Sequence, residues 1–322
     1  MTIKANPIYI SSKKEAETFI SKFDNFLLDC DGVIWLAENL IKGVPQFLDY
    51  LIENNKQFAF VTNNSSKSRD SYIEKFKNLG IKIQIPKNRI YTTSFSAVLE
   101  LKTLNIHPGS KIWVLGDEGI EDELKDQGYI PLGGSNSLLD KSFDPENPLF
   151  TIDDEVKAII VGSTNEFNFM RISTTLQYLM FKNKSLPFIG INSDRFYNGP
   201  NNLFLPAAGS ICEIASYSSN RKYINVGKPS SVFAREILRD TGFNKHKTVM
   251  IGDTMSSDIR FGNYSHLGDG QGTLLVLSGV TKFDHLKTVL DNPNQFDDVE
   301  SLIPRFYTDS LTKLITLLTE TE

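Results

Sequence analysis

Two aspartates separated by one residue, Asp29 and Asp31, are the strongest candidates for chemistry in this sequence. They follow the apolar run Asn25–Leu28, which we interpret as a buried strand, so both carboxylates can reach a crevice at the carboxyl end of a parallel sheet. Two acids in one site can take different roles. One stays ionised as a nucleophile, while like charge raises the pKa of the other and lets it hold a proton for a leaving group. Gly32 lets the backbone approach a bound anion.

The segment Asp29–Gly32 has two other interpretations. A tight turn is one of them, and this segment alone leaves it open. A calcium loop of the EF-hand type is the other, but Val33 stands where a third oxygen ligand is needed, and a strand rather than a helix is expected before it. Other segments must therefore supply the rest of an active site.

Hydroxyl and amide side chains follow a second apolar run, Phe58–Val61. Thr62, Asn63 and Asn64 come directly after it and can donate hydrogen bonds to phosphate oxygens. The two serines that follow are equally suited to capping the next helix. We therefore interpret the start of this polar segment as a candidate phosphate site.

Lys228 stands beside the start of a predicted helix that ends at Gly242. Pro229 suits the first turn of that helix. An ammonium group beside the positive end of a helix dipole makes an anion site, whereas most lysines are only solvated. Lys228 is thus a candidate phosphate ligand in combination with the other segments, and not by itself.

Asp253 ends a third strand-like run, and Asp258 lies on the helix expected after it. With Asp29 they form an acidic cluster that attracts a hard cation. Mg²⁺ fits, because it binds through one or two carboxylates and a substrate phosphate; Zn²⁺ does not, because no Cys/His cluster exists. A divalent cation and Lys228 would offset the repulsion between the aspartates and a phosphate dianion.

The elements that must position these residues alternate between strands and helices. This order predicts an α/β fold: a Rossmann-like core with a parallel sheet and helices on both of its faces. Ser12 and Glu15 form a predicted capping box for an early helix. Gly80 is expected to end the helix that contains Tyr72, and Asp309 is expected to cap the last one.

The middle of the chain predicts a second, smaller α/β domain inserted into the first. Its strand-like runs are Lys111–Leu115, Ala158–Val161 and Phe188–Ile191. The stretch Leu132–Glu155 has the composition of a surface loop. We place the core at residues 1–97 and 221–322, and the inserted domain at 98–220.

Composition excludes several classes of function. The 39 acidic and 34 basic residues give a net charge of -5 without a basic block, which argues against a nucleic-acid partner. Two cysteines suit a reducing compartment, and we expect a cytoplasmic protein. No secretory signal is apparent, and the apolar run Thr273–Val280 is too short to cross a membrane. The glycine-rich segment Gly268–Gly272 precedes a strand instead of opening a helix, so a dinucleotide site is a poor interpretation.

The four segments DCDGVIW, VTNNSSKSR, VGKPSS and GDTMSSD resemble the haloacid dehalogenase superfamily. Their order is similar to its p-nitrophenylphosphatase and phosphoglycolate phosphatase branch, which has an inserted cap domain of the C2 type. The resemblance implies a Mg²⁺-dependent phosphomonoester hydrolase that forms an aspartyl-phosphate. True dehalogenases lack the second aspartate of the first segment, so Asp31 argues for phosphoryl transfer.

The resemblance also implies a role for each motif residue. These roles are a nucleophile at Asp29, a general acid and base at Asp31, phosphate binding by Thr62, Asn64 and Lys228, and a metal site of Asp29, Asp253 and the main-chain carbonyl of Asp31, with Asp258 as direct or indirect support. Asn63 lies in the same phosphate-binding segment.

Substrate selection is expected from the cap. Its candidate residues are Asn192, Asp194 and Arg195, and Arg195 can either hold a substrate carboxylate or remain a solvated surface residue. Small phosphorylated metabolites such as 2-phosphoglycolate are the expected substrates, with p-nitrophenyl phosphate as an in vitro substrate. Pyridoxal phosphate or a phosphoprotein is the alternative, and a catalytically silent phospho-ligand-binding protein is the rival.

Two further expectations complete this interpretation. A homodimer formed through the cap is a candidate assembly. Cys30, between the two aspartates, is interpreted as a small buried residue, with an oxidation switch as the alternative.

Overall fold

The computed structural model describes residues 6–198 and 203–320, and the chain divides into two compact units. The first unit contains Met1–Thr62, Ile73–Tyr91 and Lys228–Glu322. The second contains Asn63–Tyr72 and Thr92–Gly227. The predicted inserted domain, residues 98–220, lies within the second unit, which begins earlier and ends later than that segment.

The first unit is built on a seven-stranded sheet. In spatial order its strands are β1 (Ile8–Tyr9), β16 (Phe306–Thr308), β15 (Thr273–Val276), β14 (Thr248–Gly252), β2 (Asn25–Leu28), β5 (Gln57–Thr62) and β6 (Ile90–Thr92). All neighbouring pairs from β1 to β5 in this order run parallel. The central strands β2, β14 and β15 are buried along their whole length, which explains their almost uninterrupted apolar sequence.

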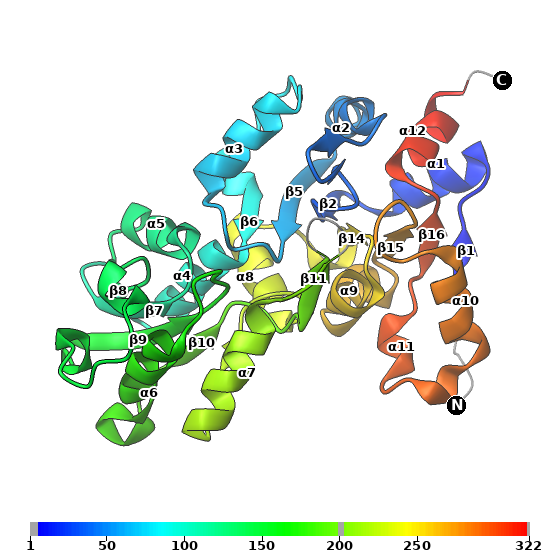
Figure 1. Ribbon diagram of the computed structural model, residues 1–322. Helices are drawn as coiled ribbons and strands as arrows, with labels where there is room; N and C mark the ends of the chain where they lie inside the picture. Colours follow the sequence, from blue (N-terminus) through cyan, green and yellow to red (C-terminus); the bar gives the residue numbers. More distant parts are fainter. Residues whose placement is uncertain (1–5, 199–202, 321–322) are drawn as a thin grey trace. The chain divides into compact units, whose positions relative to one another are not determined.

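Helices cover this sheet on two sides (Figure 1). Its helices are α1 (Lys13–Lys22), α2 (Val44–Glu53), α8 (Ser231–Thr241), α9 (Arg260–Tyr264), α10 (Phe283–Asp291), α11 (Val299–Leu302) and α12 (Leu311–Thr319). Helix α12 packs against α1 and α2, and α9 packs against α8 and α11. Helix α3 (Arg69–Asn78) begins in the second unit and ends in the first, and a short antiparallel pair, β3 (Trp35–Leu36) and β4 (Asn39–Leu40), follows β2.

The predicted helix ends are partly right. The capping box of Ser12 and Glu15 is confirmed, and Gly242 ends α8 in a left-handed conformation, as expected. The cap predicted at Asp309 is wrong, because Ser310 accepts the hydrogen bond from the first turn of α12 while Asp309 accepts one from the Tyr9 hydroxyl. The helix after Lys228 begins at Ser231, so Pro229 precedes the cap and does not occupy the first turn.

The second unit contains a smaller five-stranded parallel sheet. Its strands, in spatial order, are β13 (Ile224–Asn225), β10 (Phe188–Gly190), β9 (Val156–Val161), β7 (Lys111–Leu115) and β8 (Ile130–Gly133). Outside this sheet, the described part of the second unit has an antiparallel strand pair and several helices: β11 (Phe196–Asn198), β12 (Phe204–Pro206), α4 (Thr93–Thr103), α5 (Glu118–Asp126), α6 (Phe169–Lys184) and α7 (Ala208–Ser219). An α/β fold with a parallel core sheet and a second, inserted sheet is therefore confirmed.

The strand-like runs of the sequence did not predict β8, β11, β12 or β13 of the second unit. Strand β8 ends at Gly133, so the predicted loop Leu132–Glu155 begins inside a strand. Strand β8 lacks the usual alternation of apolar and polar residues because it lies at the edge of the sheet and contains Pro131. All of its residues are exposed or half-buried. None of the helices in the described ranges is both long and apolar enough to span a bilayer.

A buried ion pair fastens the segment Asn63–Tyr72 to the rest of the second unit. Arg69 Nε lies 2.9 Å from Glu123 Oε2 of α5, and the Arg69 backbone amide donates to Glu123 Oε1. Both side chains are almost fully buried, and the guanidinium also lies over the Phe95 ring. Asp126 is a second, more exposed partner of Arg69, at 3.5 Å.

Glu123→Gln is therefore expected to destabilise the second unit by about 3 kcal/mol, because it leaves the Arg69 charge buried without its main counterion. Asp126→Asn is the matched control and should cost less than about 1 kcal/mol, since its carboxylate is partly exposed. Urea unfolding of both variants measures the difference. An equal loss of unfolding free energy in the two variants would show that the buried pair stabilises the unit no more than the exposed one.

Candidate active site

Three aspartates of the first unit meet at the carboxyl edge of its sheet. Asp29 follows β2, Asp253 follows the neighbouring strand β14, and Asp258 lies on a π-helical turn, Met255–Ile259. One carboxylate oxygen from each lies within 4.8 Å of the others. All three side chains are buried, so the two acidic segments predicted to act together do meet.

A single buried ammonium group faces this cluster. Lys228 Nζ lies 2.5 Å from Asp29 Oδ1 and 2.7 Å from Asp258 Oδ1, and it donates to the Val61 carbonyl oxygen at 3.0 Å. Burial by itself would lower the pKa of Lys228, but the Asp258 and Asp29 carboxylates outweigh it and raise this pKa above its ordinary range. Lys228 therefore carries its positive charge in the buried site.

One ammonium does not balance three carboxylates. Burial raises the pKa of Asp29 well above its usual value, and Asp258 and Asp253 add to this although Lys228 opposes it. Burial and then Asp258 raise the pKa of Asp253 to about 6. The three carboxylates thus outnumber the one positive charge of Lys228. Their oxygens are hard ligands, and both features are typical of a divalent-cation site.

Hydrogen bonds orient the two carboxylates that follow β14. The Val280 amide donates to Asp253 Oδ2 at 2.6 Å, and the Thr254 hydroxyl donates to Asp253 Oδ1 at 2.9 Å. Asp258 Oδ2 accepts from the backbone amides of Asp253 and Thr254. One oxygen of Asp258 therefore positions the backbone beside Asp253, while its other oxygen faces Lys228.

Glycines bring the backbone against the same carboxylate. A Cβ atom at either Gly32 or Gly279 would collide with the Asp253 carboxylate, and Ser278 Oγ ties the two loops together by donating to the Gly32 carbonyl oxygen. Sequence reasoning did not assign the contact from Val280 to Asp253. The sequence signal nearest to it is the apolar run Thr273–Val280, which begins as strand β15 of the same sheet and ends at this contact.

Asp31 follows Asp29 by two residues, and Thr62 ends the strand next to β2. Neither side chain belongs to the cluster of three aspartates. Trp35 Nε1 donates to Asp31 Oδ1 at 2.9 Å, and the Asp31 side chain is exposed. Thr62 is the buried last residue of β5, the strand next to β2.

Burial, and then the Asp29 charge, raise the pKa of the Cys30 thiol well above its usual value. This favours the interpretation of Cys30 as a small buried residue over that of a reactive thiolate.

The remaining predicted residues belong to the second unit, where three of them, Asn63, Asn192 and Asp194, are joined by hydrogen bonds. Asn63 Nδ2 donates to Asp194 Oδ2 at 2.9 Å, and Asn192 Nδ2 donates to the Asn63 carbonyl oxygen at 3.0 Å. Asn64 Oδ1 accepts from the Ser66 amide and hydroxyl, in a local turn rather than a helix cap. The Arg195 side chain is exposed.

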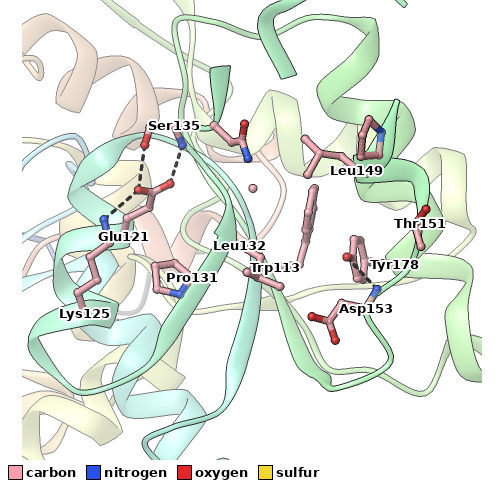
Figure 2. A pocket seen from close by; sticks show the side chains of 13 residues that line it. Trp113, Glu121, Lys125, Pro131, Leu132, Ser135, Leu149, Thr151, Asp153 and Tyr178 are labelled. Atoms are coloured by element: carbon pink, nitrogen blue, oxygen red, sulfur yellow. Dashed lines mark hydrogen bonds and ion pairs between the residues drawn. The ribbon is translucent and has the colours of Figure 1, made fainter. Parts of the chain in front are cut away.

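The second unit also has a cavity of about 410 Å³ that the sequence did not predict. Figure 2 shows Glu121 at one end, where it accepts hydrogen bonds from the amide and hydroxyl of Ser135 and pairs with Lys125. Trp113 and Tyr178, stacked at 4.4 Å between ring centroids, lie toward the other end. No predicted site residue lines this cavity.

Comparisons with known proteins agree with the fold and with the family that the sequence resembles. A family model described as haloacid dehalogenase-like hydrolase matches residues 26–130, and a second, HAD-hydrolase-like model matches residues 225–302. Phosphoglycolate phosphatase 2 of Arabidopsis thaliana is 36% identical over 95% of this chain and 97% of its own length. The 4-nitrophenylphosphatase of Schizosaccharomyces pombe is 33% identical over 95% of this chain and 97% of its own length. The solved structure of p-nitrophenyl phosphatase from Archaeoglobus fulgidus has a TM-score of 0.73 at 24% identity and covers 91% of this chain and 98% of that one.

Proposed function

Because the chain belongs to the haloacid dehalogenase-like hydrolases, in the branch of the p-nitrophenylphosphatases and phosphoglycolate phosphatases, we propose that it is a Mg²⁺-dependent hydrolase of small phosphate monoesters. The observation that carries this proposal is the buried group of Asp29, Asp253 and Asp258 around the Lys228 ammonium. The group combines a carboxylate nucleophile, a cation site and a fixed positive charge, the parts that phosphoryl transfer requires.

The residues that would hold Mg²⁺ are the carboxylates of Asp29 and Asp253 and the main-chain carbonyl of Asp31. Asp258 supports the site indirectly in this proposal, because one of its oxygens already accepts two backbone amides and the other pairs with Lys228. Bound Mg²⁺ supplies positive charge that neutralises phosphoryl oxygens. Lys228, held by Asp29 and Asp258, binds the same phosphoryl group in this proposal, together with Thr62 and Asn64; for Asn63 this role stays a prediction from the sequence.

The proposed reaction runs in two steps. In the first, an Asp29 carboxylate oxygen bonds to phosphorus while the bond to the ester oxygen breaks, and Asp31 gives its proton to the leaving oxygen. In the second, Asp31 takes a proton from water, whose oxygen bonds to phosphorus and releases Asp29 and inorganic phosphate. Trp35 orients the acid and base, because its indole nitrogen holds one Asp31 oxygen and leaves the other for the proton.

The two predicted domains take different roles in this proposal. The predicted core, residues 1–97 and 221–322, is catalytic, and the predicted inserted domain, residues 98–220, is the cap that selects the leaving group. Arg195, with its exposed guanidinium, is the candidate partner for a substrate carboxylate. Phosphoglycolate-like acids are therefore the proposed substrates, and a homodimer through the cap stays a prediction.

A substrate panel tests the proposal. With Mg²⁺, the purified protein is expected to hydrolyse p-nitrophenyl phosphate and to show a kcat/KM for 2-phosphoglycolate about tenfold above that for pyridoxal phosphate or a phosphopeptide. EDTA should abolish all phosphate release, and excess Mg²⁺ should restore it. Binding of these esters without turnover would favour the silent phospho-ligand-binding protein, and a preference for pyridoxal phosphate would favour the alternative substrate class.

A further inference from the structure

The chain passes from the first unit to the second directly beside two of the proposed phosphate ligands. It leaves the first unit between Thr62 and Asn63 and finally returns to it between Gly227 and Lys228. Thr62 and Lys228 are thus the last and first residues on the side of the first unit. Asn63 and Gly227 are the residues on the other side of these two peptide bonds. Contacts that fix them can therefore affect the two phosphate ligands.

One loop of the second unit, Asn192–Arg195, holds the first of these crossings. Asn192 Nδ2 donates to the Asn63 carbonyl oxygen at 3.0 Å, and Asp194 Oδ2 accepts from Asn63 Nδ2 at 2.9 Å. Asn63 is held by both its main chain and its side chain. The Thr93 hydroxyl donates to the same carbonyl oxygen at 3.2 Å, so the start of α4 also fixes this residue.

The same loop packs against the second crossing. A Cβ atom at Gly227 would lie 2.7 Å from the Asn192 Cβ atom, so only glycine allows this close approach. Asn225 accepts from the Gly227 amide through Oδ1 at 3.0 Å and donates to Ser193 Oγ through Nδ2 at 3.2 Å. Asn192 is nearly fully buried, which leaves it little freedom to move away from either crossing.

We propose that Asn192 and Asp194 are positioning residues for phosphate binding: through the loop Asn192–Arg195 they fix Asn63 and Gly227, the residues joined by peptide bonds to Thr62 and Lys228. The inference rests on the proposed function. It gives the side chain of Asn63 a partner in Asp194 rather than in the substrate, and it makes Asp194 act on phosphate binding through Asn63.

A reciprocal exchange tests the pair. N63D places two carboxylates face to face, and we expect it to lower kcat/KM for p-nitrophenyl phosphate by a factor of about 100, because like charges in contact repel. D194N alone leaves a donor and an acceptor in place and should cost about threefold. The double variant N63D/D194N restores one donor and one acceptor with their positions exchanged, and its activity should return to within about threefold of the wild type.

Orthovanadate supplies a readout that a merely structural contact would not change. It resembles phosphate but has no leaving group, so no cap side chain has a leaving group to bind. We expect its inhibition constant to rise about tenfold in N63D and to recover in N63D/D194N. Asp122→Asn, an exposed change on α5, is the matched control and should leave both the inhibition constant and kcat/KM unchanged.

Three results would overturn the inference. Equal loss of activity in N63D and N63D/D194N would show that the Asn63 side chain acts on the phosphate itself. A vanadate constant that stays unchanged in N63D would show that the pair does not reach the phosphate site. A double variant that unfolds at the same temperature as a destabilised N63D would show that the hydrogen bond was not restored. Loss of Mg²⁺-dependent hydrolysis in the wild type would instead reject the proposed function, so the two failures are distinguishable.

Discussion

Asp29→Asn is expected to lower kcat for p-nitrophenyl phosphate by on the order of 10⁴-fold or more, because an amide cannot form the phosphoryl bond that the carboxylate forms. The fold should survive. The pKa of Asp29 is raised by burial and by Asp258 and Asp253, so an ionised carboxylate at this position is costly without a cation. The variant should therefore melt at the same temperature as the metal-free wild type or above it.

Steady-state kinetics and thermal melts in EDTA measure both parts of this prediction. Asp24→Asn is the matched control: Asp24 precedes the same strand, but its side chain is exposed and pairs with Lys56. It should leave kcat within about twofold. Turnover of Asp29→Asn near that of the control would reject Asp29 as nucleophile.

Lys228→Met is expected to lower kcat/KM by about 10²–10³-fold, because it removes a fixed positive charge from the phosphoryl group. It should also cost about 3 kcal/mol of unfolding free energy in the absence of metal, since the buried carboxylates of Asp29 and Asp258 lose their ammonium partner. Binding of Mg²⁺ to the folded state should restore most of that stability by mass action. Activity should not recover with it.

The contrast between stability and activity makes the experiment decisive. If Lys228 only balanced charge, saturating Mg²⁺ would restore both melting temperature and kcat/KM. The separation predicted here requires the ammonium to contact the substrate. Lys245→Met, at an exposed lysine of the same unit, controls for the loss of one positive charge and should change neither quantity.

The sequence was informative where a residue's chemistry and its place at the end of a strand coincide. Asp29 and Asp253 follow apolar runs that become neighbouring parallel strands, and the carboxyl ends of such strands share one edge. Their meeting could therefore be predicted. The same logic placed Lys228 near the site, although the helix it was tied to begins only at Ser231.

The sequence was less informative where position depends on contacts between distant segments. Nothing in the pattern around Val280 indicates that its amide holds the Asp253 carboxylate, since backbone donors have no residue-type signal. Asn63 has the same side chain as Asn64 and the same preceding strand, yet it bonds to Asp194, 131 positions away. Strand β8 was missed because an edge strand with a proline lacks the usual alternation.

The sheet order of the first unit has a consequence for synthesis on the ribosome. Strand β1 pairs with β16, and β2 needs β14, whose residues emerge some two hundred positions later. The second unit, made of Asn63–Tyr72 and Thr92–Gly227, is complete before any of β14 to β16 has been translated. We therefore expect the cap to fold first on the nascent chain, while the edge of β2 that pairs with β14 still lacks its partner and depends on chaperones for protection from aggregation.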